Sequence, residues 1–96
     1  MTLDDLRRQK RAAILAIAAK HGVKNILVFG SFASGEARDN SDLDLLIDTG
    51  SQTTSWFPGG LLADLEDELG RRVDLAEEQG LHPLIRNQVL SEAIPL

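Results

Sequence analysis

The chain has 96 residues, no cysteine and a formal net charge of −5. This length predicts one domain spanning residues 1–96, and the absence of cysteine excludes disulfides and thiolate metal sites, which fits a reducing cytoplasm. The acidic balance argues against direct nucleic-acid binding, and no apolar run approaches the ~20 residues of a membrane span.

The first half of the chain predicts two helices and two strands. Thr2 and Asp5 form a capping-box pattern that opens a helix ending at Gly22. We expect a buried strand over residues 25–29, a short helix over 32–37, a turn over 39–41 and a second strand over 43–47. The first helix has an apolar face at helical spacing, formed by Leu3, Leu6, Ala13, Ile14, Ile17 and Ala18.

The second half predicts two more helices and one more strand. Residues 49–60 read as a loop whose Trp56 and Phe57 either plug the edge of the core or contact a base or a partner. A helix follows and stops at Gly70, a third strand covers 72–76, and Pro83 starts the last helix. The inward residues of that helix are predicted to be Leu84, Ile85, Val89, Leu90 and Ala93. The order α-β-α-β-α-β-α predicts an α+β fold, a small mixed sheet flanked by helices.

Two charged features are interpreted as structural. His21 lies at a helix end, where a contact with the helix dipole is expected. Glu66, Asp67 and Glu68 read as a solvated helix face.

The most informative segment links the first two strands. Gly30-Ser31 follows the first strand, and Asp42 and Asp44 open the second. Residues two apart on a strand point to the same face, so both carboxylates project together, roughly 6.6 Å apart along the strand. This arrangement suits two divalent cations held about 4 Å apart. The Gly-Ser turn offers backbone N–H groups and a hydroxyl suited to phosphate.

Asp74 supplies a third carboxylate from the third strand. It lies between Val73 and Leu75, which face the core, so Asp74 faces the opposite side. If strand three neighbours strand two, Asp74 joins Asp42 and Asp44 as a metal ligand or general base. Three carboxylates beside a phosphate-binding Gly-Ser turn would then suit phosphoryl or nucleotidyl transfer.

These residues resemble the minimal nucleotidyltransferase (MNT) group of the DNA polymerase β superfamily. The resemblance implies the nucleotidyltransferase fold, two Mg²⁺ ions and ATP as substrate. It implies that Asp42, Asp44 and Asp74 are the metal-binding and catalytic residues, and that nucleotide binding involves Gly30, Ser31, Arg38 and Ser41. It also implies an antitoxin that forms a hetero-oligomer with a HEPN-domain toxin and transfers AMP to a toxin tyrosine.

One position departs from the family pattern Gly-Ser-x-Ala-Arg-Gly. Ser34 stands where the family has Arg, a side chain that clamps phosphate bidentately. Arg38, one helical turn further on, is the expected substitute.

Three functions remain open at this point. The first is an AMP-transferring enzyme that acts on a protein. The second is an antitoxin that is catalytically weak or inactive and neutralises the toxin by binding alone, a reading motivated by Ser34 and the acidic surface. The third is a regulatory module that binds ATP without transfer. Three clustered carboxylates favour the first, because like charges held together are costly without a function.

Overall fold

The computed structural model describes residues 1–49 and 57–96, so Trp56 and most of the predicted loop lie outside the described residues. The helices are α1 (Leu3–Gln9), α2 (Arg11–Lys20), α3 (Gly30–Ser34), α4 (Gly59–Leu69) and α5 (Pro83–Glu92), with a 3₁₀ turn at Glu78–Gly80. The strands are β1 (Val23–Phe29), β2 (Leu43–Thr49), β3 (Val73–Glu77) and β4 (Ile94–Pro95). None of these helices is long and apolar enough to cross a membrane.

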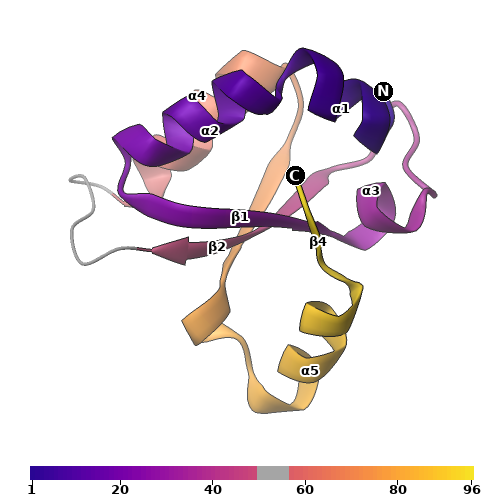
Figure 1. Ribbon diagram of the computed structural model, residues 1–96, viewed down its shortest axis with the longest axis vertical. Coiled ribbons are helices and arrows are strands. Elements are labelled where there is room, and N and C mark those ends of the chain that lie inside the picture. Colours follow the sequence, from indigo (N-terminus) through magenta and orange to yellow (C-terminus); the bar gives the residue numbers. More distant parts are fainter. Residues whose placement is uncertain (50–56) are drawn as a thin grey trace.

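The strands form one mixed sheet in the order β3-β2-β1-β4. β2 pairs antiparallel with β1 and parallel with β3, and β4 pairs antiparallel with β1. Helices α1, α2 and α4 cover one face of the sheet, and α5 stands on the other side (Figure 1). The predicted α+β class and the mixed sheet are confirmed.

The core lies between the sheet and the three helices on one face. The helices contribute Leu6, Ile14, Ala18, Leu61, Leu65 and Leu69, and the sheet contributes Val23, Ile26, Val28, Leu43, Leu45, Ile47 and Val73. Leu46 is also buried, at 2% exposure, but it projects from the opposite face and is not part of this cluster. The predicted alternation along β2 therefore places Asp44 and Asp48 away from the helix-covered core.

The first predicted helix is in fact two. The capping box is present, because Thr2 and Asp5 exchange hydrogen bonds of 3.0 and 3.1 Å between side chain and backbone. The helix then breaks at Lys10, whose φ and ψ are −123° and −10°. Residues 7–12 contain no large apolar side chain, so nothing in this turn holds a single straight helix against the core.

The prediction for the last helix is wrong for Leu84 and Ile85, whereas Val89, Leu90 and Ala93 are partly buried. Leu84 is 85% exposed and Ile85 48% exposed, and no residue of α5 is buried. The helix stands on the side of the sheet that α1, α2 and α4 do not cover, so only part of its surface is packed (Figure 1).

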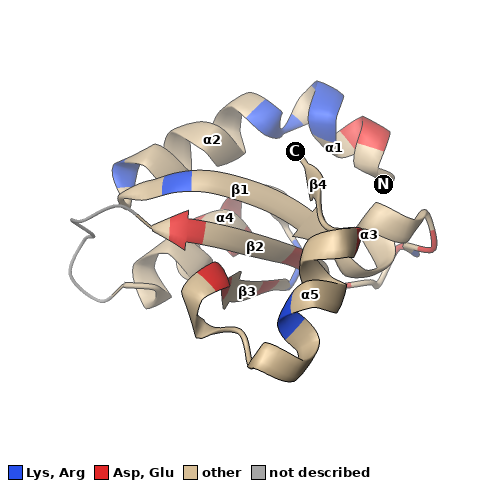
Figure 2. Cartoon of the chain, turned by 60° about the horizontal axis from the view of Figure 1, so that its bottom comes forward, with Lys and Arg blue, Asp and Glu red and all other residues tan. Residues whose placement is uncertain are grey.

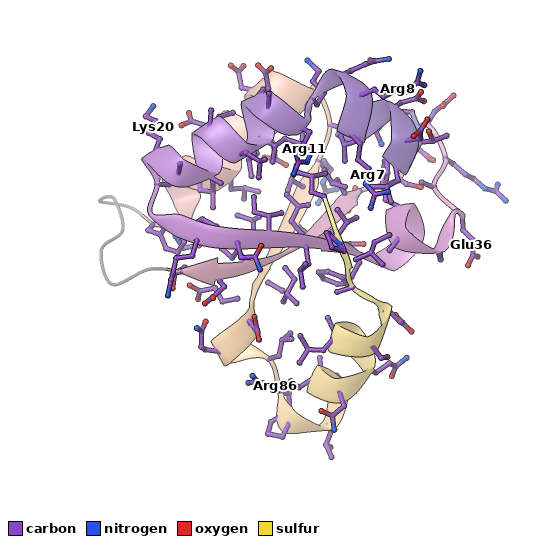
Figure 3. All side chains as sticks on the ribbon, viewed as in Figure 1. Arg7, Arg8, Arg11, Lys20, Glu36 and Arg86 are labelled. Carbon is purple, nitrogen blue, oxygen red and sulfur yellow. The ribbon has the colours of Figure 1, made fainter. Side chains whose placement is uncertain are left out.

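The segment after α5 forms a strand that the sequence pattern did not predict. Ile94 and Pro95 pair with Val28 and Leu27 of β1. The guanidinium of Arg7 donates to the carbonyl of Pro95, and Arg11 donates to Leu96 at 3.2 Å (Figure 3). These long-range contacts fix the end of α5 relative to β1.

The two structural interpretations are incomplete, although His21 does lie at the carboxyl end of α2 and Asp67 and Glu68 are exposed. His21 is buried at 6% exposure, and its Nε2 lies 2.7 Å from an Asp64 carboxylate oxygen on α4. Glu66 is not simply solvated, because its carboxylate accepts a 3.0 Å hydrogen bond from the backbone N–H of Val73. Both side chains join α4 to neighbouring elements.

Candidate active site

The candidate site lies where β1 ends and β2 and β3 begin. Phe29, the last residue of β1, is the register partner of Asp44, and Gly30 follows with a left-handed φ of +68°. A Cβ at position 30 would lie 3.0 Å from Cγ of Asp44 and closer still to a carboxylate oxygen. The positive φ favours glycine at this turn, and the contact with Asp44 leaves no room for a side chain.

The third carboxylate arrives from the neighbouring strand. Asp44 and Asp74 are register partners in the parallel β2–β3 pair, directly opposite each other. The predicted adjacency of these two strands is therefore confirmed. Figure 2 shows the acidic start of β2 in the part of the molecule where α3 and α5 also lie.

The carboxylates interact electrostatically. Burial raises the pKa of Asp44 above its ordinary value of 3.8, and the neighbouring carboxyls of Asp74 and Asp42 raise it further. Like charges held together in a partly desolvated place disfavour ionisation. A bound cation would relieve this repulsion, so the cluster is chemically suited to hold one.

The geometry does not form a metal site on its own. Among residues 1–49 and 57–96, no group of three or more acidic or histidine side chains is arranged to hold a metal ion. The donors that are present are carboxylate oxygens, the ligands that Mg²⁺ prefers. Further oxygen ligands would have to come from a bound nucleotide.

A cleft opens beside the Gly-Ser turn. It has a volume of about 500 Å³ and is lined by Gly30, Ser31, Ala33, Ser34, Glu36 and Glu92. Gly30 and Ser31, the two residues predicted to bind phosphate, both line this cleft. Glu92, at the end of α5, was missed. Glu92 lines the cleft because α5 lies against α3, and no local sequence pattern indicates that contact.

Arg38 and Ser41 do not line this cleft. The Ser41 hydroxyl accepts a 2.8 Å hydrogen bond from the backbone N–H of Arg38, and its carbonyl accepts one of 2.9 Å from Arg71. The Arg71 guanidinium also lies 5.1 Å from the centre of the Phe32 ring. Ser41 and Arg71 therefore order the segment that leads into Asp42.

Comparisons with known proteins agree with this fold. The family model described as nucleotidyltransferase domain matches residues 10–96. The protein adenylyltransferase MntA of Thermococcus cleftensis is 34% identical over 94 residues, covering 98% of this chain and 95% of that protein. A solved structure described as "Structure of putative minimal nucleotidyltransferase" is 49% identical with a TM-score of 0.85, and the match covers 100% of this chain and 97% of the other.

The chain belongs to the nucleotidyltransferase domain family. Within it, the chain is similar to minimal nucleotidyltransferases and to proteins named protein adenylyltransferase, so the predicted family and enzyme class are confirmed. The fold is also that of a solved structure described as "Crystal structure of the toxin-antitoxin with AMP-PNP", at 20% identity and a TM-score of 0.76. That match covers 90% of this chain and 71% of the other.

Proposed function

We propose that this protein is a Mg²⁺-dependent protein adenylyltransferase that acts as an antitoxin. It transfers AMP from ATP to a hydroxyl side chain, a tyrosine, of a HEPN-type toxin. The observation that carries the proposal is the pairing of Asp44 with Asp74 beside the Gly30 turn. The names of its relatives, an adenylyltransferase and a toxin–antitoxin bound to an ATP analogue, support the substrate and the partner.

Each residue of the site has a role in this proposal. Gly30 and Ser31 hold the triphosphate in the cleft. Asp42 and Asp44 hold two Mg²⁺ ions together with oxygens of the nucleotide, and Asp74 completes the site and accepts the proton of the attacking hydroxyl. When bound, the metal would supply charge stabilisation to the pentacoordinate phosphorus of the transition state and to the departing pyrophosphate.

Metal binding is testable without a partner. Calorimetry on the isolated protein should show ATP binding that strengthens when Mg²⁺ is added, because phosphate oxygens complete the ligand set. The Asp42→Asn/Asp44→Asn double variant should lose this Mg²⁺ dependence. Mg²⁺-dependent binding that is unchanged in the double variant would remove these residues from the metal site.

The transfer itself is tested with the partner. Mixing the protein, a HEPN-type toxin, ATP and Mg²⁺ should raise the intact mass of the toxin by one AMP unit or a multiple of it. Asp74→Ala should abolish the gain while the complex still forms, and Asp67→Asn, which removes a charge from the exposed face of α4, should not. An unmodified toxin that is nevertheless inhibited would establish the second candidate, neutralisation by binding alone, which the neutral Ser34 in the cleft favours.

A further inference from the structure

The nucleotide cleft has an acidic wall. Glu92, the last residue of α5, and Glu36, which follows α3, both line it, and the other lining residues are uncharged. The end of α5 reaches this position because α5 packs against α3. A cleft that is to receive a highly charged triphosphate therefore presents two carboxylates and no cationic side chain.

Glu92 is an exposed carboxylate at the carboxyl end of α5. A carboxylate at the carboxyl end of a helix opposes the helix dipole, and the last turn of α5 contains no basic residue. In the part of the chain that the structure describes, no Lys or Arg lies within ion-pair distance of Glu92. Departures from the charge preference of helix ends occur at functional positions.

Two arginines near the cleft, Arg71 and Arg86, have other contacts. Arg71 is held by the carbonyl of Ser41 and the ring of Phe32. Arg86, on α5 itself, lies 3.8 Å from the Glu78 carboxylate and donates to the Glu78 carbonyl, near the 3₁₀ turn (Figure 3). Neither Arg71 nor Arg86 forms an ion pair with Glu92.

We propose that Glu92 weakens ATP binding in the free protein and that a basic side chain of the acceptor protein neutralises it. Docking of the acceptor and binding of ATP then strengthen each other. This inference rests on the proposed function, because it concerns the acceptor of the same reaction. Charge complementarity selects the occupant: a protein surface with a Lys or Arg that enters between α3 and α5.

Helix α5 also supplies the apolar part of this docking surface. Leu84 and Ile85 are exposed on the helix that carries Glu92. α5 stands on the side of the sheet that α1, α2 and α4 do not cover (Figure 1). The alternation along β2 places Asp44 on that side too, because Leu43 and Leu45 belong to the helix-covered core. An acceptor that approaches Asp44 from this side meets α5. The expected acceptor surface is an apolar patch next to a basic residue.

The first test uses the isolated protein and titrates it with Mg²⁺–ATP by calorimetry. Glu92→Gln should bind about fivefold more tightly than the unmodified chain at low salt, and the difference should shrink at high salt because the site is open to solvent. The matched control Asp67→Asn removes the same charge from α4, outside the cleft, and should have no effect. ATP binding by Glu92→Gln that is unchanged or weaker would overturn the proposal.

The second test measures the coupling with the HEPN-type acceptor, using α,β-methylene-ATP, which cannot transfer AMP. The acceptor should tighten nucleotide binding to the unmodified chain, and the nucleotide should tighten acceptor binding by the same factor. Glu92→Gln should reduce that factor by about fivefold. An equal factor in both proteins would overturn the coupling.

The docking surface has its own control. Leu84→Asp should weaken acceptor binding, whereas Leu15→Asp, at a 37% exposed position on α2, should not. Equal acceptor binding by Leu84→Asp and the unmodified chain would overturn the docking assignment. Failure of the proposed function is distinguishable, because it would show as an unmodified acceptor in the presence of ATP, whatever Glu92→Gln does to nucleotide affinity.

Discussion

Gly30 and Asp44 lie so close together that position 30 has no room for a side chain. The Asp44 carboxylate occupies the space that a Cβ would fill, and the φ of +68° at Gly30 independently favours glycine. The backbone of the turn after β1 thus lies directly against the carboxylate of Asp44, near the start of β2. Phosphate held by this backbone would lie beside the carboxylates proposed to hold metal.

Gly30→Ala should therefore destabilise the protein and abolish nucleotide binding. The left-handed backbone and the overlap with Asp44 together should lower the free energy of unfolding by about 3 kcal/mol. Gly35→Ala is the matched control, because Gly35 also has a positive φ of +82° but nothing lies within 4 Å of its Cβ position. That variant should lose about 1 kcal/mol and keep ATP binding. Equal losses in urea denaturation would show that the Asp44 contact is unimportant.

Asp44→Asn should stabilise the protein while removing its function. The pKa of Asp44 is raised in the folded state, first by burial and then by Asp74 and Asp42. Its ionisation therefore costs folding free energy at neutral pH, and removing the charge should raise the free energy of unfolding, by less than about 1 kcal/mol because the site is partly exposed. Mg²⁺-dependent ATP binding should be lost in the same variant.

The pH dependence of this effect has a definite sign. A raised pKa means that the penalty is complete above the folded-state pKa and disappears as the pH falls toward the ordinary value of 3.8. The difference in unfolding free energy between Asp44→Asn and the unmodified chain should therefore shrink as the pH is lowered through that window. A difference that grows on acidification would contradict the assigned repulsion.

The His21–Asp64 pair should contribute to the stability of the α2–α4 packing. His21 is buried, and a Cβ on Gly60 would lie 3.2 Å from its ring. His21→Ala should lower the free energy of unfolding by about 2 kcal/mol through the lost hydrogen bond and contact. Denaturant unfolding at neutral pH checks this, with Lys24→Ala, exposed on β1, as the surface control.

Asp64 gives the complementary pH test. The hydrogen bond from His21 lowers the pKa of Asp64 below 3.8, and Lys20 lowers it further. A lowered pKa contributes stability above the ordinary value, and this contribution is lost as the pH falls through the folded-state pKa. Asp64→Asn should therefore be less stable than the unmodified chain at neutral pH and equal to it in strong acid.

Local patterns predicted the strands that carry the candidate site. The alternation over residues 43–47 predicted that Asp44 faces away from the core. The alternation of Val73, Asp74 and Leu75 predicted the same for Asp74. Their pairing needed one assumption, that the third strand neighbours the second, and the sheet order confirms it. Positions that depend on short-range periodicity were thus accessible from the sequence.

Features that depend on contacts distant in sequence were not accessible. β4 has only two residues, one of them Pro95, and exists because it pairs with β1. His21 and Asp64 are 43 residues apart. Glu92 reaches the cleft only because α5 packs against α3. No local sequence pattern predicts these contacts. The spacing of the apolar residues of α5 likewise does not indicate which of them are buried against the sheet.

The corrected orientation of α5 can be checked by stability alone. Leu65→Ala, at a fully buried position on α4, should cost about 3 kcal/mol. Leu84→Ala, at a position 85% exposed, should change the free energy of unfolding by less than about 0.5 kcal/mol. A large loss of unfolding free energy in Leu84→Ala would instead support the inward orientation of Leu84 that the sequence predicted.

Ser34→Arg should strengthen ATP binding if the cleft holds phosphate. Ser34 lines the cleft, and its hydroxyl bonds only the Ser31 carbonyl among the described residues, at 3.2 Å, so the substitution removes little. A new charge-assisted contact with phosphate is worth about 1.5–3 kcal/mol at best, and an exposed position should deliver about a tenfold gain in affinity. Calorimetry with Mg²⁺–ATP measures it.

The control for this variant is Gln9→Arg, which adds the same charge at an exposed position on α1 that does not line the cleft. It separates a local contact from the general effect of making an acidic protein less negative. A gain in Ser34→Arg alone would place the phosphate groups next to position 34. Equal gains in both variants would mean that long-range charge alone explains the higher affinity for ATP. No gain in either variant would indicate that the triphosphate does not bind next to α3.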